Sequence, residues 1–361
     1  MTGGSRTDPA DVRPVLVTGG AGFIGANLAD RLAGDGHRVR ILDALSRAGT
    51  ERNLQWLQDR HGERIEFIRA DIRDRAAVDA AVAGAKAVFH YAAQVAVTTS
   101  MVDPVVDFEV NIQGTLGVLE ALRRRADGTP LVFASTNKVY GDLADLDFAL
   151  EGDAYVPLDP DVRAHGIGEA RPLDFHTPYG VSKGAADQYV LDYARSFRVP
   201  TCVLRMSCIY GQRQMGTEDQ GWVAHFLIRA LEGRAITLYG DGHQVRDILD
   251  VADAVEAYLA AWERIDEVKG RAFNLGGGPD NAVSLRELLG YMGHLLGREV
   301  DIRFEDWRAG DQRYFVADTR AADAALALPA KTDWREGVAQ LAGWLAAERR
   351  LNLPVAQGVA A

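Results

Sequence analysis

Cysteine is scarce in this sequence: only Cys202 and Cys208 occur in 361 residues. Both lie in or beside one apolar run, TCVLRMSCIYG, so we interpret them as small core or pocket-wall residues, not as a disulfide or a metal pair. No run reaches the ~18 apolar residues of a membrane span, and the N-terminus lacks the apolar core of a signal peptide. These absences favour a cytoplasmic protein without a membrane partner or a bound metal.

Positive charge is also in short supply, because the formal net charge is −11. A protein that coats nucleic acid needs a basic face, so we expect no nucleic-acid partner. A few well-placed arginines are enough for a small phosphorylated ligand, which the acidic balance therefore does not exclude. With 47% hydrophobic residues, the chain is long enough for a large core and for two domains, or one domain with a lobe.

Short apolar runs alternate with helix-length amphipathic segments along the first two thirds of the chain. We expect strands at residues 15–18, 38–42, 65–70, 87–92, 131–135 and 201–206, and helices at 23–34, 74–84, 108–125 and 181–196. This alternation predicts an α/β fold, a Rossmann-type doubly wound parallel sheet covered on both faces. After residue 206 the pattern of shorter elements predicts a smaller, interleaved C-terminal lobe. Residues 142–178 form a polar connection of a length that is usually functional or mobile.

A glycine motif lies between the first strand and the first helix. VLVTGGAGFIGANLADRL contains Gly19, Gly22 and Gly25, which let the backbone approach a pyrophosphate at a helix N-terminus. Asp43 ends the next strand, where it can accept hydrogen bonds from ribose hydroxyls. Its carboxylate would repel a 2′-phosphate, so NAD is favoured over NADP, although Arg47 could hold that phosphate.

The ends of the following strands extend the cofactor site. Asp71 ends the third strand, where it can cap the next helix, hydrogen-bond adenine, or do both. The end of the fourth strand would border the cofactor through its backbone. The residues that we assign to the cofactor site are Gly19, Gly22, Phe23, Ile24, Gly25, Asp43, Ser46, Arg47, Asp71, Ile72, Ala92, Ala93, Gln94, Asn111, Tyr179, Lys183 and Met206.

The segment HTPYGVSKGAADQY indicates the chemistry. Tyr179 and Lys183 are spaced i and i+4, so they share one face of a helix. Such a pair alone is more often a core tyrosine beside a surface lysine, but the upstream glycine motif favours a catalytic pair. An ammonium and a cationic nicotinamide would lower the phenol pKa from ~10 toward 7, which needs about 4 kcal/mol. We expect Tyr179 to take a proton from a substrate hydroxyl, oriented by Thr136, while hydride leaves the same carbon to NAD⁺.

These pieces together resemble the extended short-chain dehydrogenase/reductase family, which is the family of NAD-dependent epimerases and dehydratases. The matching segments are TGGAGFIG, AAQV, NIQGT, STNKVYG and YGVSK, with Asp43 and Asp71, and the resemblance runs from about residue 14 to about residue 345. It implies a nucleotide-sugar substrate, NAD held for redox chemistry, and a catalytic triad that falls on Thr136, Tyr179 and Lys183. It also implies a homodimer formed through the helices at 108–125 and 181–196.

A narrower resemblance is to the CDP-tyvelose (CDP-paratose) 2-epimerases of that family, through STNKVYGDL, EDQGWVAHF, GHQVRDILDVAD and GDQRYFVAD. It implies inversion of C2 of a CDP-linked dideoxyhexose, by transient oxidation to a 2-keto sugar and reduction on the other face. Arg246 and Arg313 match positions that grip the diphosphate, whereas Cys208 stands where many relatives have Asn. The residues that we assign to the substrate are Thr98, Thr136, Asn137, Lys138, Ser207, Cys208, Gln220, Gly221, Trp222, Arg246 and Arg313.

Three other functions compete with this one. A 4,6-dehydratase needs an acid and a base, and its relatives carry Asp-Glu where this chain has Asn137-Lys138. Lysine is a poor base unless it is strongly desolvated, so dehydration is disfavoured. A nucleotide-sugar 4-epimerase stays open, because the triad does not distinguish C2 from C4. The intact triad argues against a non-catalytic NAD-binding protein.

The expected domain boundaries follow these changes in pattern. We expect a disordered leader at 1–13, an NAD-binding Rossmann domain at 14–205 with about 247–275, a substrate-binding lobe at 206–246 and 276–348, and a flexible tail at 349–361.

Overall fold

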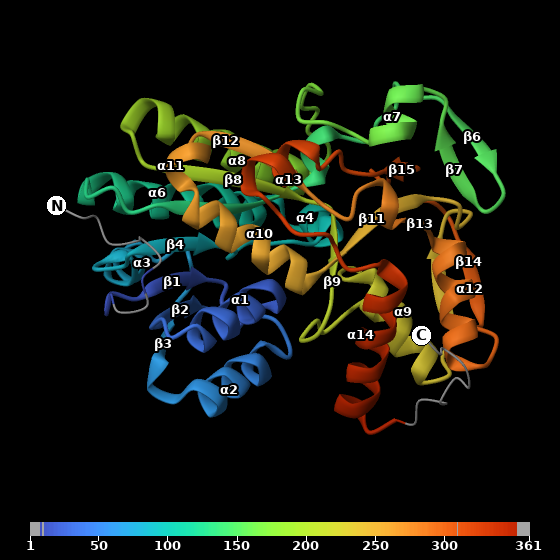
Figure 1. Ribbon diagram of the computed structural model, residues 1–361, viewed down its shortest axis with the longest axis horizontal. Coiled ribbons are helices and arrows are strands. Elements are labelled where there is room, and N and C mark those ends of the chain that lie inside the picture. Colours follow the sequence, from blue (N-terminus) through green and yellow to red (C-terminus); the bar gives the residue numbers. More distant parts are fainter. Residues whose placement is uncertain (1–7, 9–10, 309, 352–361) are drawn as a thin grey trace.

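The computed structural model describes residue 8, residues 11–308 and residues 310–351 (Figure 1). Its central layer is a seven-stranded sheet in the order β12-β8-β5-β4-β1-β2-β3, and every neighbouring pair is parallel. The strands are β1 (Val15–Thr18), β2 (Val39–Asp43), β3 (Ile65–Arg69), β4 (Ala87–His90), β5 (Leu131–Thr136), β8 (Thr201–Met206) and β12 (Arg271–Leu275). The predicted Rossmann-type fold is confirmed, and β12 adds a strand that the sequence pattern did not single out.

Helices cover both faces of this sheet, which explains why β1, β4 and β5 read as continuous apolar runs. On one face the core is shared by α1 (Phe23–Gly34), α2 (Thr50–His61), α10 (Val251–Glu263), α11 (Ile265–Val268) and α13 (Arg320–Leu326). On the other face it is shared by α3 (Arg75–Val82), α6 (Gly114–Arg125) and α8 (Thr177–Phe197). The two buried clusters make the sheet a rigid base for the loops at its strand ends.

The helix expected at 108–125 is divided into three parts. After α4 (Val97–Val102) come α5 (Pro104–Phe108), a π-helical turn η2 (Glu109–Gln113), and then α6. Such π-turns within helices are often found at functional sites. The turn precedes Gly114, where a Cβ would come 2.8 Å from the Ile72 side chain, so the helix lies very close to the third strand end.

Asp71 does not cap α3, which was one of the two roles considered for it. The Asp74 carboxylate caps this helix, accepting from the backbone N–H groups of Ala76 and Ala77. Asp71 instead pairs with Arg73 at 2.8 Å. The capping role therefore belongs to the residue directly before the helix, where the geometry of an N-cap requires it.

A third buried cluster forms the lobe seen at the right of Figure 1. One lobe sheet has the order β13-β11-β15 with β9 paired to β11, and a second sheet joins β10 and β14. The lobe elements are β9 (Cys208–Tyr210), α9 (Trp222–Leu231), β10 (Ile236–Tyr239), β11 (Val245–Asp250), β13 (Ala282–Ser284), α12 (Leu285–Leu296), β14 (Ile302–Glu305), β15 (Tyr314–Phe315) and α14 (Trp334–Arg349). Three 3₁₀ turns complete the structure: η1 (Gly62–Arg64), η3 (Asn137–Tyr140) and η4 (Pro279–Asn281).

The long connection at 142–178 carries its own structure. It contains a hairpin of β6 (Phe148–Glu151) and β7 (Ala154–Pro157), followed by α7 (Pro160–His165). The hairpin packs on the lobe, because the Tyr155 N–H donates to the His243 carbonyl at 3.0 Å and Phe148 contacts Tyr314. The connection therefore ties the end of β5 and the start of α8 to the lobe.

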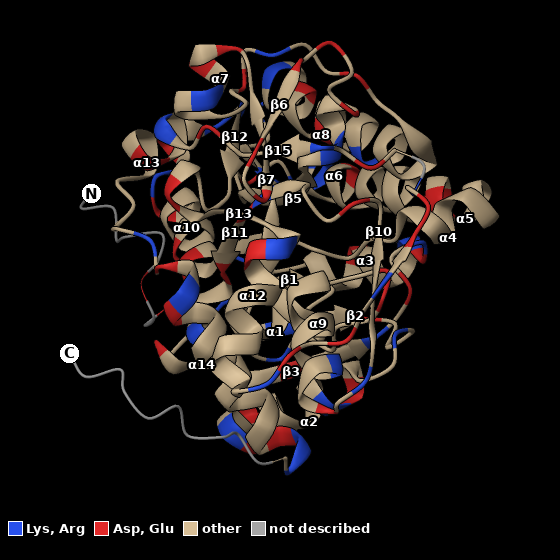
Figure 2. Cartoon of the chain, turned by 90° about the vertical axis from the view of Figure 1, so that its right-hand side faces the viewer, with Lys and Arg blue, Asp and Glu red and all other residues tan. Residues whose placement is uncertain are grey.

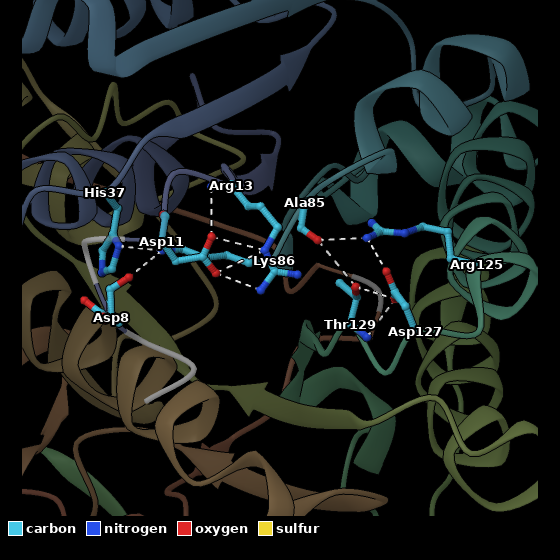
Figure 3. Close-up of polar contacts among 9 residues, drawn as sticks. All are labelled: Asp8, Asp11, Arg13, His37, Ala85, Lys86, Arg125, Asp127 and Thr129. Carbon is cyan, nitrogen blue, oxygen red and sulfur yellow. Dashed lines mark hydrogen bonds and ion pairs between the residues drawn. The ribbon is translucent and has the colours of Figure 1, made fainter. Parts of the chain in front are cut away.

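Part of the expected leader is held against the sheet. The Lys86 ammonium donates to the backbone carbonyls of Asp8 and Asp11, at 2.9 and 3.1 Å, and lies 3.1 Å from His37 Nδ1 (Figure 3). The rest of the leader lies outside the described residues. At the other end α14 continues to Arg349, and Arg350 and Leu351 of the expected tail hydrogen-bond back to it, while residues 352–361 lie outside the described part.

Charged residues of both signs alternate over the helices and loops of the face in Figure 2. In the described part of the chain, no helix combines the length and the apolar character that crossing a membrane requires.

Candidate active site

Two cavities meet at Tyr179, beside the carboxyl ends of the central strands. The Rossmann cavity, of about 270 Å³, lies over the glycine motif, and the lobe cavity, of about 580 Å³, lies between β5, α9 and β10. Val95, Tyr179 and Gln220 line both. A group at this junction can act on molecules held in either cavity.

The glycine motif is shaped by close backbone contacts. Gly19 has φ +68°, and a Cβ on it would lie 2.7 Å from the Ala92 nitrogen. A Cβ on Gly25 would lie 2.4 Å from the Gly19 carbonyl oxygen, so helix α1 can start this close to the loop only with glycine. No side chain caps the first turn of α1, which leaves its amides available to an anion.

Asp43 stabilises the loop and lines the Rossmann cavity. Its carboxylate accepts from the Ala21 N–H at 3.0 Å and from the Leu45 N–H at 2.8 Å, while burial raises its pKa. Arg47 donates to the Gln220 side chain at 2.9 Å and so connects this loop to the lobe. A strand-end carboxylate, uncapped helix amides and a glycine cradle together fit an adenine dinucleotide such as NAD.

The structure brings most of the assigned cofactor residues to this cavity. Those that line it are Gly19, Gly22, Phe23, Ile24, Gly25, Asp43, Ser46, Arg47, Asp71, Ile72, Ala92, Ala93, Tyr179, Lys183 and Met206. Residues of this cavity that the sequence pattern did not indicate are Leu42, Ala44, Thr50, Ala70, Tyr91, Val95, Val110, Ala134 and Ser135, and Gln220, which was assigned to the substrate, lines it as well. Several of these end a parallel strand, which is a signal that the sequence already contained.

Gln94 and Asn111 were assigned to the cofactor site, but they do not line either cavity. Asn111 Oδ1 accepts from the Gln94 N–H at 2.9 Å, and Asn111 Nδ2 donates to the Ser182 hydroxyl at 2.9 Å. These bonds join the fourth strand end to α8. Both residues therefore brace the wall of the site.

The three expected catalytic residues come together at the end of β5. The Thr136 hydroxyl donates to Asn137 Oδ1 at 3.3 Å, accepts from the Lys138 N–H at 3.2 Å, and acts on the Tyr179 phenol. The Lys183 ammonium donates to the Ala134 carbonyl at 2.6 Å and lies 4.3 Å from the centre of the Phe133 ring. The i, i+4 spacing on α8 thus places both side chains against one strand end.

Burial dominates the electrostatics of this pair. It raises the pKa of Tyr179 to about 12, with the Thr136 hydrogen bond opposing the shift and the Asp107 charge adding to it. It also lowers the pKa of Lys183 to about 7, against the charges of Asp187 and Asp107. In the ligand-free protein the phenol is therefore neutral, which differs from the expected shift toward 7. The expected shift rested on two positive charges, the Lys183 ammonium and a bound nicotinamide. Burial opposes the first by lowering the pKa of Lys183, and the protein itself does not supply the second.

The lobe cavity receives most of the assigned substrate residues, namely Thr98, Thr136, Asn137, Lys138, Cys208, Gln220, Gly221, Trp222 and Arg246. The Arg246 guanidinium is buried and donates to the Asp311 carboxylate at 2.7 Å and the Gln312 carbonyl at 2.6 Å. These bonds fix its orientation at the cavity wall.

Arg313 and Ser207 were assigned to the substrate, but they do not line either cavity. Arg313 is exposed on the hairpin side, 5.5 Å from the centre of the Tyr155 ring, and the Ser207 hydroxyl donates to the Asp247 carboxylate. Arg308 lines the lobe cavity instead, 3.8 Å from the centre of the Tyr239 ring. The sequence could have indicated Arg308 through its position in the segment WRAGD, just after a lobe strand.

Asn137 and Lys138 face the lobe cavity from η3. The Lys138 ammonium donates to the Gly310 carbonyl at 3.1 Å, and burial lowers its pKa while Asp311 opposes this. At Cys208 the thiol accepts from the Trp222 indole at 3.3 Å, and burial raises its pKa. The side chain that replaces the usual Asn is thus occupied by a neighbouring tryptophan.

Known proteins resemble this chain over nearly its whole length. Residues 15–276 match the NAD dependent epimerase/dehydratase family. A CDP-paratose 2-epimerase of Salmonella typhi is 40% identical over 91% of this chain and 98% of its own, and a putative UDP-glucose 4-epimerase of Methanocaldococcus jannaschii is 31% identical over 92% and 98%. A UDP-glucose 4-epimerase of Thermus thermophilus, solved as a complex with NAD, superposes with a TM-score of 0.77 at 31% identity, over 92% of this chain and 98% of that one.

Proposed function

Because the chain belongs to the NAD dependent epimerase/dehydratase family, we propose that it is a nucleotide-sugar epimerase that inverts C2 of a CDP-linked dideoxyhexose. The observation that carries this proposal is the 40% identity to a CDP-paratose 2-epimerase, against 31% to a putative UDP-glucose 4-epimerase. Asn137 and Lys138 support it, because neither is a carboxyl group able to drive loss of water.

The residues at the junction of the cavities have separate tasks. Tyr179 takes the proton of the sugar hydroxyl and later returns it, while Thr136 orients that hydroxyl. Lys183 supplies the positive charge that favours ionisation of Tyr179. The glycine motif, Asp43 and the strand ends would hold NAD, which supplies a hydride acceptor and donor for transient oxidation of the reacting carbon.

The lobe cavity must hold the sugar while both of its faces are presented in turn. We propose that Arg246 and Arg308 bind the diphosphate, because both line this cavity and guanidinium groups suit that charge. Anchoring at the diphosphate leaves the sugar ring free to turn within the cavity beside Tyr179. Gln220, Gly221 and Trp222 border the space between this anchor and the Rossmann cavity.

A panel of nucleotide hexoses tests this function directly. The purified protein, loaded with NAD, is incubated in D₂O with CDP-, UDP-, dTDP- and GDP-linked sugars, and the products are analysed by NMR. We expect inversion at C2 of a CDP-linked 3,6-dideoxyhexose without solvent deuterium on that carbon. Deuterium on C2 would contradict direct oxidation there. Inversion at C4 of a UDP-hexose would assign the protein to the 4-epimerases, and loss of water would assign it to the dehydratases.

We further propose a homodimer formed through the two helical regions predicted for it, 108–125 and α8, together with the neighbouring α4 and α5. These helices expose large apolar side chains, namely Met101, Val102, Val105, Phe108, Val181, Tyr189 and Phe197. Exposed apolar surface of this kind favours a protein partner. Light scattering of the NAD-loaded protein at micromolar concentration is expected to give twice the mass of the chain, and a monomer would reject the proposal.

We also propose a cytoplasmic location, because both cysteines are free thiols.

A further inference from the structure

Asp107, on α5, is a buried carboxylate without a matching charge. Its side chain is 0% exposed. Oδ1 accepts from Gln94 Nε2 at 2.7 Å and from Asn111 Nδ2 at 3.2 Å, while Oδ2 has no hydrogen-bond partner among the described residues. Both donors are neutral amides. A buried carboxylate in such surroundings is costly unless a positive charge lies nearby.

Lys183 is the nearby positive charge, and its burial is costly for the same reason. It is 4% exposed, and the charges of Asp187 and Asp107 both raise its pKa, against the larger effect of burial. Its other titratable neighbours are neutral: burial and Lys183 itself lower the pKa of His90 to about 3, and Tyr179 is an un-ionised phenol. The two carboxylates are therefore the charged groups that favour a proton on Lys183, in addition to its hydrogen bond to the Ala134 carbonyl.

Of these two carboxylates, Asp187 is already matched by a cation. Arg205 binds it in a two-pronged ion pair, with Nε to Oδ2 and Nη2 to Oδ1 both at 3.0 Å, and the Ser135 hydroxyl donates to it at 2.8 Å. Asp187 has the larger effect of the two on the pKa of Lys183, but it also serves as the ion-pair partner of Arg205. Asp107 has no cationic partner of this kind among the described residues, so Lys183 is the cation on which its charge acts.

Hydrogen bonds hold Asp107 in register with the catalytic helix. Asn111 Nδ2, which donates to Asp107, also donates to the hydroxyl of Ser182, the residue before Lys183. Asn111 lies in the π-turn η2, which follows α5 directly. Through Asn111, this network links the Asp107 carboxylate on α5 to the Ser182 hydroxyl on α8.

We propose that Asp107 is a positioning residue for the proposed epimerase reaction, supplying the uncompensated negative charge that keeps Lys183 protonated beside Tyr179. The catalytic meaning of this role rests on the proposed function. The direct effect of Asp107 on Tyr179 works in the opposite sense, because a carboxylate disfavours a phenolate. It is the smallest of the three causes that act on the pKa of that phenol.

The test uses the low lysine content of the chain, which has only Lys86, Lys138, Lys183, Lys269 and Lys331. Full-length protein with ¹³C at the lysine ε-carbon, with and without NAD, is titrated by NMR, and Lys183→Arg assigns the signal. Asp107→Asn should lower the titration midpoint of Lys183 by about one pH unit or more. In this variant the amide oxygen of the new side chain can keep the two hydrogen bonds that Oδ1 accepts, and the amide nitrogen can take the place of the unpartnered Oδ2. Asp107→Ser repeats the loss of charge if the asparagine variant does not fold.

The control is Asp103→Asn, which removes an exposed carboxylate that caps the same helix and does not act on Lys183. We expect an unchanged midpoint for it. An unchanged midpoint in a folded Asp107 variant overturns the proposal, whatever the activity. Since the titration needs no turnover, a shifted midpoint in a protein without epimerase activity would reject only the proposed function. In active enzyme, the alkaline limb of kcat should move down by the same amount, because activity that needs protonated Lys183 is lost above its pKa.

Discussion

Replacing Tyr179 by phenylalanine is expected to lower kcat for epimerisation by about 10²- to 10⁴-fold, the usual contribution of a general acid–base group. The substitution removes only the hydroxyl, and the ring keeps its place between the two cavities. No other tyrosine or histidine among the described residues lines both cavities, so the variant has no substitute at the junction. NAD content after purification, measured by absorbance, should be unchanged, which separates lost chemistry from lost binding.

Tyr193→Phe is the matched control for this experiment. It removes a hydroxyl from the same helix, where Tyr193 donates to Glu120 at 2.6 Å, remote from both cavities. We expect a small change in thermal stability and a kcat within about twofold of the parent. Full activity in Tyr179→Phe would reject the catalytic role of Tyr179 and reopen the possibility of a non-catalytic NAD-binding protein.

Arg246→Met is expected to raise the KM for the nucleotide sugar by about 10- to 100-fold, since hydrogen bonds to charged groups contribute about 1.5–3 kcal/mol. The diphosphate is present in the ground state and in the transition state alike, so kcat should change much less than KM. The Asp311 carboxylate loses its partner in this variant. A melting curve and a measurement of NAD content are therefore needed beside the steady-state kinetics.

Arg313→Met tests whether the role that the sequence predicted for Arg313 or its position in the structure is the better guide. The resemblance placed both arginines on the diphosphate, but Arg313 lies outside the lobe cavity over Tyr155. We expect its KM to stay near that of the parent. If Arg313→Met impairs binding as strongly as Arg246→Met, the nucleotide is bound at the hairpin side and not in the lobe cavity.

Local patterns account for the features that the sequence predicted well. The glycine motif, Asp43 and the Tyr179–Lys183 pair each depend on residues that are near one another in the chain, within a strand–turn–helix or within one helical turn. Asp71 shows the limit of this reasoning, because its spacing before α3 suited a cap but Asp74 was closer to the helix start. Strand-end positions were predictable as a group, since parallel strands bring their carboxyl ends to one edge.

Contacts between distant segments account for the errors. Asn111 is positioned by a π-turn and by bonds to Gln94 and Ser182, which no periodicity indicates. The choice between Arg308 and Arg313 depends on how a loop after β14 turns against β10, and both arginines fit a short motif equally well. The hairpin of β6 and β7 was similarly hidden in a polar connection, because its pairing and its packing on the lobe are tertiary.

The sequence by itself determined the family, the NAD-binding fold and the end of β5 at which Thr136, Tyr179 and Lys183 meet, because these follow from local spacing and from the order of parallel strands. Only the tertiary structure decided which charges act on that site. Electrostatic interactions act between groups that are distant in the chain, so the sequence could not show that Asp187 has an arginine partner. It also could not show that one oxygen of Asp107 has no hydrogen-bond partner among the described residues. The tertiary structure also placed Tyr179 between two cavities, a position that depends on how the lobe closes over the sheet.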